Sequence, residues 1–231
     1  VNPFTSRRMT RRDISEFTIR RLSLYLRRLR ELREAGTEVV SSRQLADGSG
    51  TTPAQVRKDL SLFGSFGKRG RGYQVSALLE TLESILGLGR TWRVALVGAG
   101  KIGRALLGYG DLERRGFRIV TAFDTDPEKI GQSHYGVEIR PLDELEETVR
   151  GERVEMAIVA TPPEAAQETA SRLVEAGVTG ILNFAPVKVD VPPEVTLRGV
   201  DVVLELEGLS FALTSDAVEP SRREPGSAAG G

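Results

Sequence analysis

The segment Val94-Ala-Leu-Val-Gly-Ala-Gly-Lys-Ile-Gly103 decides the fold of the second half of this 231-residue chain. Four apolar residues, typical of a buried strand, run directly into the pattern G-x-G-x-x-G, and a helical pattern follows. In such a turn Gly98 makes the tight bend, Gly100 lets a pyrophosphate approach the backbone, and Gly103 lets the helix pack closely on the strand. The segment therefore predicts the first strand, turn and helix of a dinucleotide-binding α/β domain.

Short apolar runs continue to alternate with helical patterns after this turn, which is the signature of a parallel α/β sheet. We expect a Rossmann-like, doubly wound parallel sheet over residues 88–205. Its predicted strands are residues 93–97, 118–123, 137–140, 156–160, 180–183 and 200–204.

Asp124 closes the second predicted strand, about where a carboxylate accepts the ribose hydroxyls of a dinucleotide. The next residues, Thr125-Asp-Pro-Glu128, carry no cation for a 2′-phosphate, which favours NAD(H) over NADP(H). A glycine turn that serves packing alone, in a domain that binds CoA, another nucleotide or nothing, is the alternative. The predicted cofactor-binding residues of this region are Gly98, Ala99, Gly100, Lys101, Ile102, Gly103, Asp124 and Thr161.

The N-terminal part has a different character. Residues 1–76 carry 16 Lys and Arg against 7 Asp and Glu, and the remainder carries 16 against 25, so the net charge of 0 hides an asymmetry. Helical patterns at 13–36, 42–47 and 54–62 surround a turn of small residues, with Thr52 as N-cap and Pro53 at the first helical position. Residues 64–73 hold four glycines and three cations, which suits a β-loop or wing. We expect a winged helix-turn-helix over residues 1–87, with residues 1–12 as a basic arm.

The third predicted helix would present polar side chains to a DNA major groove. Arg and Lys donate to guanine, and Gln pairs with adenine. Cations on the wing suit backbone phosphates or the adjacent minor groove. The alternative is a solvated charged helix beside a loop. The predicted DNA-binding residues are Gln55, Arg57, Lys58, Ser61, Lys68, Arg69 and Arg71.

Composition narrows the remaining functions. The chain has no cysteine and a single histidine, His134, so we expect no disulfide, no Cys nucleophile and no metal site. No apolar run approaches the roughly 18–20 residues that span a bilayer, and the N-terminus lacks a secretory pattern, so we expect no membrane partner and a cytoplasmic location. Residues 219–231 have the composition of a disordered tail.

Hydride-transfer enzymes need a positioned acid or base. His134 lies in a loop segment, and Tyr109 and Lys188 are candidates, but no second constellation forms a substrate site. We therefore expect a regulator and no enzyme. Two alternatives stay open: an NAD-dependent oxidoreductase with a basic N-terminal domain, and a nucleotide- or CoA-binding subunit whose basic domain contacts protein or RNA.

Four segments carry a resemblance to a known family over residues 13–213. They are Ile19-Arg-Arg-Leu-Ser-Leu-Tyr-Leu-Arg27, Gln55-Val-Arg-Lys-Asp-Leu-Ser-Leu-Phe-Gly-Ser-Phe-Gly-Lys-Arg-Gly-Arg-Gly-Tyr73, Val97-Gly-Ala-Gly-Lys-Ile-Gly-Arg-Ala-Leu-Leu107 and Gly180-Ile-Leu-Asn-Phe-Ala-Pro186. The second is highly specific, whereas the glycine turn alone is not. The chain resembles the Rex family of redox-sensing transcriptional repressors.

This resemblance implies a homodimer whose winged helices bind a palindromic operator in double-stranded DNA. It implies that the Rossmann domains bind NAD+ or NADH, that NADH drives release from DNA, and that a C-terminal helix, here 206–218, is swapped between subunits. It implies a redox switch of Arg27, Tyr109 and Asp201, and a nicotinamide end lined by Asn183, Phe184 and Ala185. Val202 departs from the family pattern, in which an aromatic often stands beside the acid.

Overall fold

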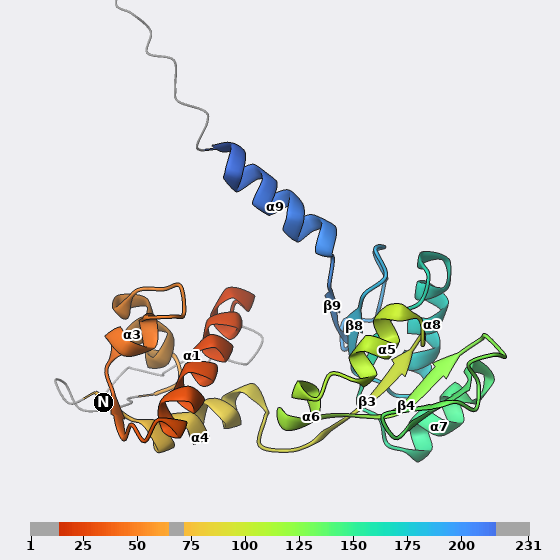
Figure 1. Cartoon of the computed structure of the whole chain (residues 1–231), viewed down its shortest axis with the longest axis horizontal. Coiled ribbons are helices and arrows are strands. Elements are labelled where there is room, and N and C mark those ends of the chain that lie inside the picture. The colour runs from red at the N-terminus through yellow and green to blue at the C-terminus, as the bar shows by residue number, and fades with distance from the viewer. Residues whose placement is uncertain (1–13, 65–71, 216–231) are drawn as a thin grey trace, which may run out of the picture. The chain divides into compact units, whose positions relative to one another are not determined.

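The computed structural model describes residues 14–64 and 72–215, which fall into two compact units, Val1–Thr91 and Trp92–Gly231 (Figure 1). The predicted domain boundary after residue 87 thus precedes the observed one by a short linker. The predicted arm, the wing cations Lys68, Arg69 and Arg71, and the predicted tail lie outside the described residues.

The first unit is built from helices around one apolar core. The helices are α1 (Glu16–Glu34), α2 (Ser42–Ala46), α3 (Pro53–Ser61) and α4 (Val75–Leu86), and β1 (Val39–Val40) pairs antiparallel with β2 (Tyr73–Gln74). The side chains of Thr52 and Ser41 cap α3 and α2, as expected for a helix-turn-helix. Fully buried side chains from every helix close the core, among them Leu22, Tyr25, Leu29, Leu45, Val56 and Leu79. The predicted helix-turn-helix is confirmed, whereas most of the predicted wing lies outside the described residues.

One large apolar residue of α1 lies outside the core. Phe17 fits the apolar spacing of the first helix, yet its side chain is 77% exposed. The helix begins only after Ser15, whose side chain accepts a hydrogen bond from the Thr18 N–H at 3.2 Å. Thr18 therefore takes the inward position of the first turn, where it joins a polar network.

The second unit contains a seven-stranded sheet in the order β5-β6-β4-β3-β7-β8-β9. All neighbours are parallel except the β5–β6 hairpin. The order reverses between β3 and β7, as in doubly wound nucleotide-binding folds, so the prediction is confirmed. The strands are β3 (Trp92–Val97), β4 (Phe117–Asp124), β5 (Ser133–His134), β6 (Val137–Pro141), β7 (Met156–Val159), β8 (Gly180–Asn183) and β9 (Thr196–Gly199).

Helices cover the two faces of this sheet unequally. On one face, α7 (Leu145–Gly151), which follows the short helix η2 (Leu142–Glu144), and α8 (Pro163–Glu175) bury a continuous apolar cluster. On the other face, α5 (Lys101–Leu107) packs against the sheet, and α6 (Asp111–Arg114) contacts β4. The remaining part of that face forms an apolar groove of about 490 Å³, lined by side chains that include Val94, Ile119, Met156, Ile158 and Leu182.

The prediction of a last strand at residues 200–204 is wrong. The strand β9 ends at Gly199, and a helix, α9 (Val202–Ser215), follows almost at once. The Asp201 carboxylate accepts hydrogen bonds from the N–H groups of Val203 and Leu204 at 2.9 and 3.3 Å, which is how an N-cap starts a helix. The predicted helix at 206–218 therefore begins too late, and the predicted domain end at 205 lies inside α9. Among the described residues, no helix is both long enough and apolar enough to cross a membrane.

A two-pronged ion pair joins α7 to α8. Arg172 donates from Nε and Nη2 to the two carboxylate oxygens of Glu146 at 2.6 and 2.8 Å, and this lowers the pKa of Glu146 to about 2. A carboxylate with a lowered folded-state pKa stabilises the fold above its unfolded pKa, near 4.5, and loses that contribution as the pH falls towards 2.

We expect Glu146→Gln to lower the free energy of unfolding at pH 7 by about 1–3 kcal/mol, because it leaves Arg172 half-paired. The difference from the unaltered chain should narrow as the pH falls from 6 to 3. Urea titration followed through the fluorescence of the single tryptophan, Trp92 of β3, measures it within this unit. The control is Glu144→Gln, which removes an exposed pair with Arg140. A stability difference independent of pH would contradict the ion-pair account.

Candidate functional site

Each of the three glycines in and after the turn between β3 and α5 has a different structural role. Gly98 has φ of +97°, and a Cβ there would lie 2.5 Å from the carbonyl oxygen of Ala160. A Cβ on Gly103 would lie 2.0 Å from the carbonyl oxygen of Gly98, so only glycine lets the helix approach the turn. At Gly100, by contrast, a Cβ would meet nothing within 4 Å. The bend, the close packing and the open approach that the sequence predicts are all present.

This turn borders a pocket of about 390 Å³ where the strand order reverses. Gly98, Gly100, Asp124 and Thr161 line it, together with Lys129. The hydroxyl oxygen of Thr161 is buried and has no hydrogen-bond partner within the described parts of the chain. A buried hydroxyl without a partner is costly, so a ligand that accepts or donates a hydrogen bond fits here.

Asp124 organises the other side of the pocket. Its carboxylate accepts hydrogen bonds from the backbone N–H groups of Ala99 at 2.8 Å and Asp126 at 2.9 Å, and from Lys129 Nζ at 3.2 Å. Burial would raise the pKa of Asp124, but these hydrogen bonds outweigh it and hold the pKa below its ordinary value. The side chain is therefore ionised at neutral pH, ready to accept ribose hydroxyls.

Lys129 is the residue that sequence reasoning missed. No cation follows Asp124 directly, but the turn after β4 brings Lys129 back to both Asp124 and Asp126, at 3.2 Å from each. The two carboxylates exceed the single ammonium by one negative charge. This negative balance favours a ribose hydroxyl over a 2′-phosphate. The preference for NAD(H) therefore rests on the net charge of the site and not on the absence of a nearby cation.

The remaining predicted cofactor residues do not line this pocket. Ala99 is buried beneath the turn, and Lys101 and Ile102 are exposed at the start of α5. Asn183, at the end of β8, donates from Nδ2 to the carbonyl oxygens of Ala185 and Val187 at 3.1 and 3.0 Å and accepts from the Ala185 N–H at 3.0 Å. Asn183 thus shapes the loop that carries Phe184 and Ala185, at the same sheet edge as the glycine turn.

The three predicted switch residues fall in both units. Tyr109 lies just beyond α5, which ends at Leu107, and is 56% exposed. Asp201 caps α9 in the same unit, whereas Arg27 is exposed on α1 of the first unit. Their pairing stays a prediction.

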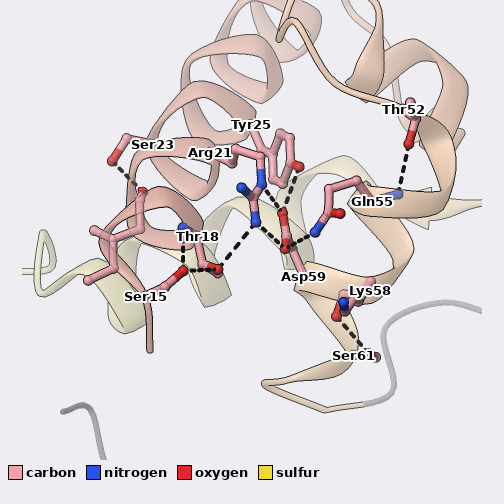
Figure 2. A network of polar contacts seen from close by, with 11 residues as sticks. Ser15, Thr18, Arg21, Ser23, Tyr25, Thr52, Gln55, Lys58, Asp59 and Ser61 are labelled. Carbon is pink, nitrogen blue, oxygen red and sulfur yellow. Dashed lines mark hydrogen bonds and ion pairs between the residues drawn. The ribbon is translucent and has the colours of Figure 1, made fainter. Parts of the chain in front are cut away.

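On α3, the predicted DNA-binding residues divide into two kinds. Arg57, Lys58 and Ser61 are exposed, and Arg57 donates to the hydroxyl of Ser42 on α2 at 3.0 Å. Gln55 was expected to face outward as well. It is half-buried, and its Nε2 donates to Asp59 Oδ1 at 2.7 Å (Figure 2).

Asp59 is the centre of a network that the sequence did not reveal (Figure 2). The residue is only 1% exposed, and Arg21, Tyr25 and Gln55 all donate to its carboxylate. Burial would raise the pKa of Asp59, but these hydrogen bonds lower it below its usual value. Burial, and next the contact with Asp59, raise the pKa of Tyr25 to about 12. The only sequence signal was an acid in an otherwise basic helix.

Fold and site together define a class of protein: a helix-turn-helix with a cationic helix, joined in one chain to a doubly wound domain with a dinucleotide-type pocket. Two family models match. The model described as putative DNA-binding protein N-terminus covers residues 13–61, and the model described as CoA binding domain covers residues 89–187.

Full-length relatives identify the family. The chain is 50% identical over 203 residues to a redox-sensing transcriptional repressor Rex of Carboxydothermus hydrogenoformans, covering 88% of this chain and 98% of the relative. It is 49% identical to the Rex of Desulfitobacterium hafniense, covering 86% and 94%. The chain belongs to the Rex family of redox-sensing transcriptional repressors. These relatives are named as repressors, which supports a regulator over an enzyme.

Solved structures agree with this membership. A crystal structure of RSP in complex with beta-NAD+ and operator DNA matches with a TM-score of 0.84 and 36% identity, over 88% of this chain and 94% of that one. RSP in complex with beta-NADH matches with a TM-score of 0.80 and 35% identity, over 88% and 96%.

We expect Asp124→Ala to weaken NADH binding by about 10- to 100-fold, because a charged acceptor of two hydroxyl hydrogen bonds is lost. Fluorescence titration of NADH measures the change. Asp190→Ala is the matched control, since that carboxylate is exposed and pairs only with the exposed Lys188 in the described structure. An affinity equal to that of the control variant would remove Asp124 from the ribose site.

Proposed function

We propose that this chain is an NADH-responsive repressor, which binds palindromic operator DNA as a homodimer and is released when NADH binds. The observation that carries the proposal is the union, in one chain of the Rex family, of a cationic recognition helix with a pocket that leaves the Thr161 hydroxyl buried and unsatisfied. Relatives named as redox-sensing repressors, and a similar structure that contains NAD+ and operator DNA, support it.

In this proposal the pocket residues hold the cofactor. Gly98 and Gly100 admit the pyrophosphate, Asp124 accepts the ribose hydroxyls, Thr161 bonds the bound molecule, and the loop after Asn183 borders the nicotinamide end. When bound, the cofactor supplies a ring that is positively charged in NAD+ and neutral in NADH. A ligand shifts an equilibrium only through different interactions with the two states, so the residues that sense this charge decide the response.

We assign that sensing to Tyr109, Arg27 and Asp201, as the family resemblance implies. Tyr109 is exposed just beyond the C-terminal end of α5, the helix whose N-terminal end follows the glycine turn. In the DNA-binding state Arg27 of the winged helix pairs with Asp201 across the dimer. Asp201 already accepts two backbone hydrogen bonds as the cap of α9, so a change in its pairing also bears on that helix.

On the DNA side, Arg57 and Lys58 offer donors to base edges or phosphates, and the hydroxyl of Ser61 lies on the same exposed face. The wing cations Lys68, Arg69 and Arg71 supply phosphate contacts. Because such contacts release counterions, operator affinity should fall steeply with salt. A repressor acts where its operator lies, so we propose a cytoplasmic location.

The dimer rests on α9 in this proposal. Seven large apolar side chains of this helix are between 58% and 80% exposed, on more than one of its faces. A helix that is apolar all round needs burial on more than one face. The sheet face beside α5 offers an apolar groove that no helix of the second unit covers within residues 92–215. We propose that α9 of each subunit is exchanged with the partner, as the family resemblance implies.

We expect the unaltered chain to shift a duplex that carries the palindromic operator, and NADH to abolish the shift while NAD+ does not. Tyr109→Phe should still bind both DNA and NADH but should need at least about tenfold more NADH for release, because the sensing hydroxyl is gone. A gel-shift titration at fixed salt measures both. The proposal fails if NAD+ and NADH affect operator binding equally.

We expect the double substitution Leu209→Asp and Phe211→Asp to convert a dimer into a monomer of 25.1 kDa, because both side chains are exposed on α9 and would be buried in the partner. Size-exclusion chromatography with light scattering measures the mass. Glu205→Gln, on the same helix, is the control. A dimer that survives the double substitution would contradict helix exchange.

A further inference from the structure

Two helices of the first unit begin with the same motif but use it differently. Ser41-Ser-Arg-Gln44 opens α2 and Thr52-Pro-Ala-Gln55 opens α3, and both fit the capping-box pattern. In α2 the box is closed, since Gln44 Oε1 accepts from the Ser41 N–H at 2.9 Å. In α3 the Thr52 hydroxyl caps the helix, but the Gln55 side chain turns the other way and donates to Asp59 at 2.7 Å (Figure 2).

The chemistry of Asp59 fixes which end of the Gln55 amide faces it. The buried carboxylate binds two donors at each oxygen: Arg21 Nη2 and Gln55 Nε2 at Oδ1, both at 2.7 Å, and Arg21 Nε and Tyr25 Oη at Oδ2, at 2.6 and 2.9 Å. An ionised carboxylate only accepts hydrogen bonds, so the nitrogen of Gln55 must point inward. Its carbonyl oxygen Oε1 then points away from Asp59.

We propose that Asp59 is a positioning residue that fixes the polarity of the Gln55 amide, so that Gln55 offers its carbonyl oxygen to the exocyclic amino group of an adenine or cytosine in the operator. Gln55 is the third residue of α3, and the first residues of a recognition helix are those that meet base edges. Adenine N6 and cytosine N4 are the major-groove donors of the four bases. This inference rests on the proposed operator binding.

The surrounding contacts make the polarity rigid. Arg21 also donates to Thr18 Oγ1 at 3.2 Å, and Thr18 is bonded to Ser15, the N-cap of α1. The backbone N–H of Gln55 is held separately by Thr52 at 3.2 Å. The backbone and the side chain of Gln55 are therefore both held by hydrogen bonds before DNA binds. A side chain that contacts a specific base needs such support.

The test deletes single functional groups from the operator. In one set of duplexes each adenine or cytosine is replaced in turn by an analogue that lacks the exocyclic amino group, and in a second set each guanine by 2-aminopurine, which lacks O6. Dissociation constants are measured with the full-length protein, without NADH. We expect one amino deletion to weaken the unaltered chain by about tenfold, and to leave Gln55→Ala unaffected because the contact is already lost.

Asp59→Asn and Tyr25→Phe then separate positioning from mere stability. Asparagine offers Gln55 either an oxygen or an N–H group, so the amide loses its fixed polarity and the tenfold effect should fall to about threefold or less. Tyr25→Phe removes a donor at Oδ2, the oxygen that does not hold Gln55. This variant should lower the melting temperature, as Asp59→Asn does, yet retain the full tenfold effect. NADH affinity should stay unchanged in both.

Three results would overturn the inference while the proposed function stands. In the first, removal of an amino group weakens operator binding by Asp59→Asn as much as by the unaltered chain. In the second, Gln55→Ala is insensitive only to the loss of a guanine O6 and still responds to every amino deletion. In the third, Tyr25→Phe loses the tenfold effect just as Asp59→Asn does. No operator binding by the unaltered chain would overturn the proposed function, and this inference with it.

Discussion

The contact between the turn at Gly98 and the backbone of Ala160 is the constraint on which the second unit depends. With a Cβ position only 2.5 Å from the Ala160 carbonyl oxygen, the loop after β3 lies directly on the end of β7. That contact lies at the point where the strand order of the sheet reverses, and it sets Thr161 beside the glycine turn. The hydrogen bond from the Ala99 N–H to Asp124 ties the same loop to β4. One backbone approach thus brings the glycine turn, Asp124 and the unsatisfied Thr161 hydroxyl to one pocket.

Local chemistry explains how much of this the sequence predicted. The glycine turn and the capped start of α3 depend on neighbouring residues, and both appear where expected. The strand prediction for residues 200–204 is wrong. Val202 and Val203 are β-branched residues typical of strands, but the Asp201 side chain caps a helix there. The network at Asp59 joins residues 34 and 38 positions apart, which no periodicity reveals. The turn after β4 brings Lys129 back to Asp124, and the order of charged residues in the sequence does not predict the shape of that turn.

The asymmetry of the second unit has one physical origin. Helices α7 and α8 fill one face of the sheet, but α5 and α6 are short and leave an apolar groove on the other. At about 25 cal/mol per Å² of apolar surface, an uncovered groove and an exposed apolar α9 both cost stability that association recovers. In the proposed helix exchange, the last helix is buried only in a dimer. The stability of the unit that carries the cofactor pocket would then depend on its partner.

The buried charge at Asp59 follows the same logic at the DNA end. A buried ion pair contributes little to net stability compared with apolar packing, so its value lies in orientation. Arg21 and Tyr25 of α1 donate hydrogen bonds to Asp59 of α3. The same helix α1 carries the predicted switch residue Arg27, about 1.7 turns after Arg21. Because α1 and α3 are joined by directional hydrogen bonds to one carboxylate, we propose that a displacement of Arg27 moves both helices together. In the proposed function, such a rigid-body rotation would let a small free-energy difference at the cofactor separate the two recognition helices of a dimer from their half-sites.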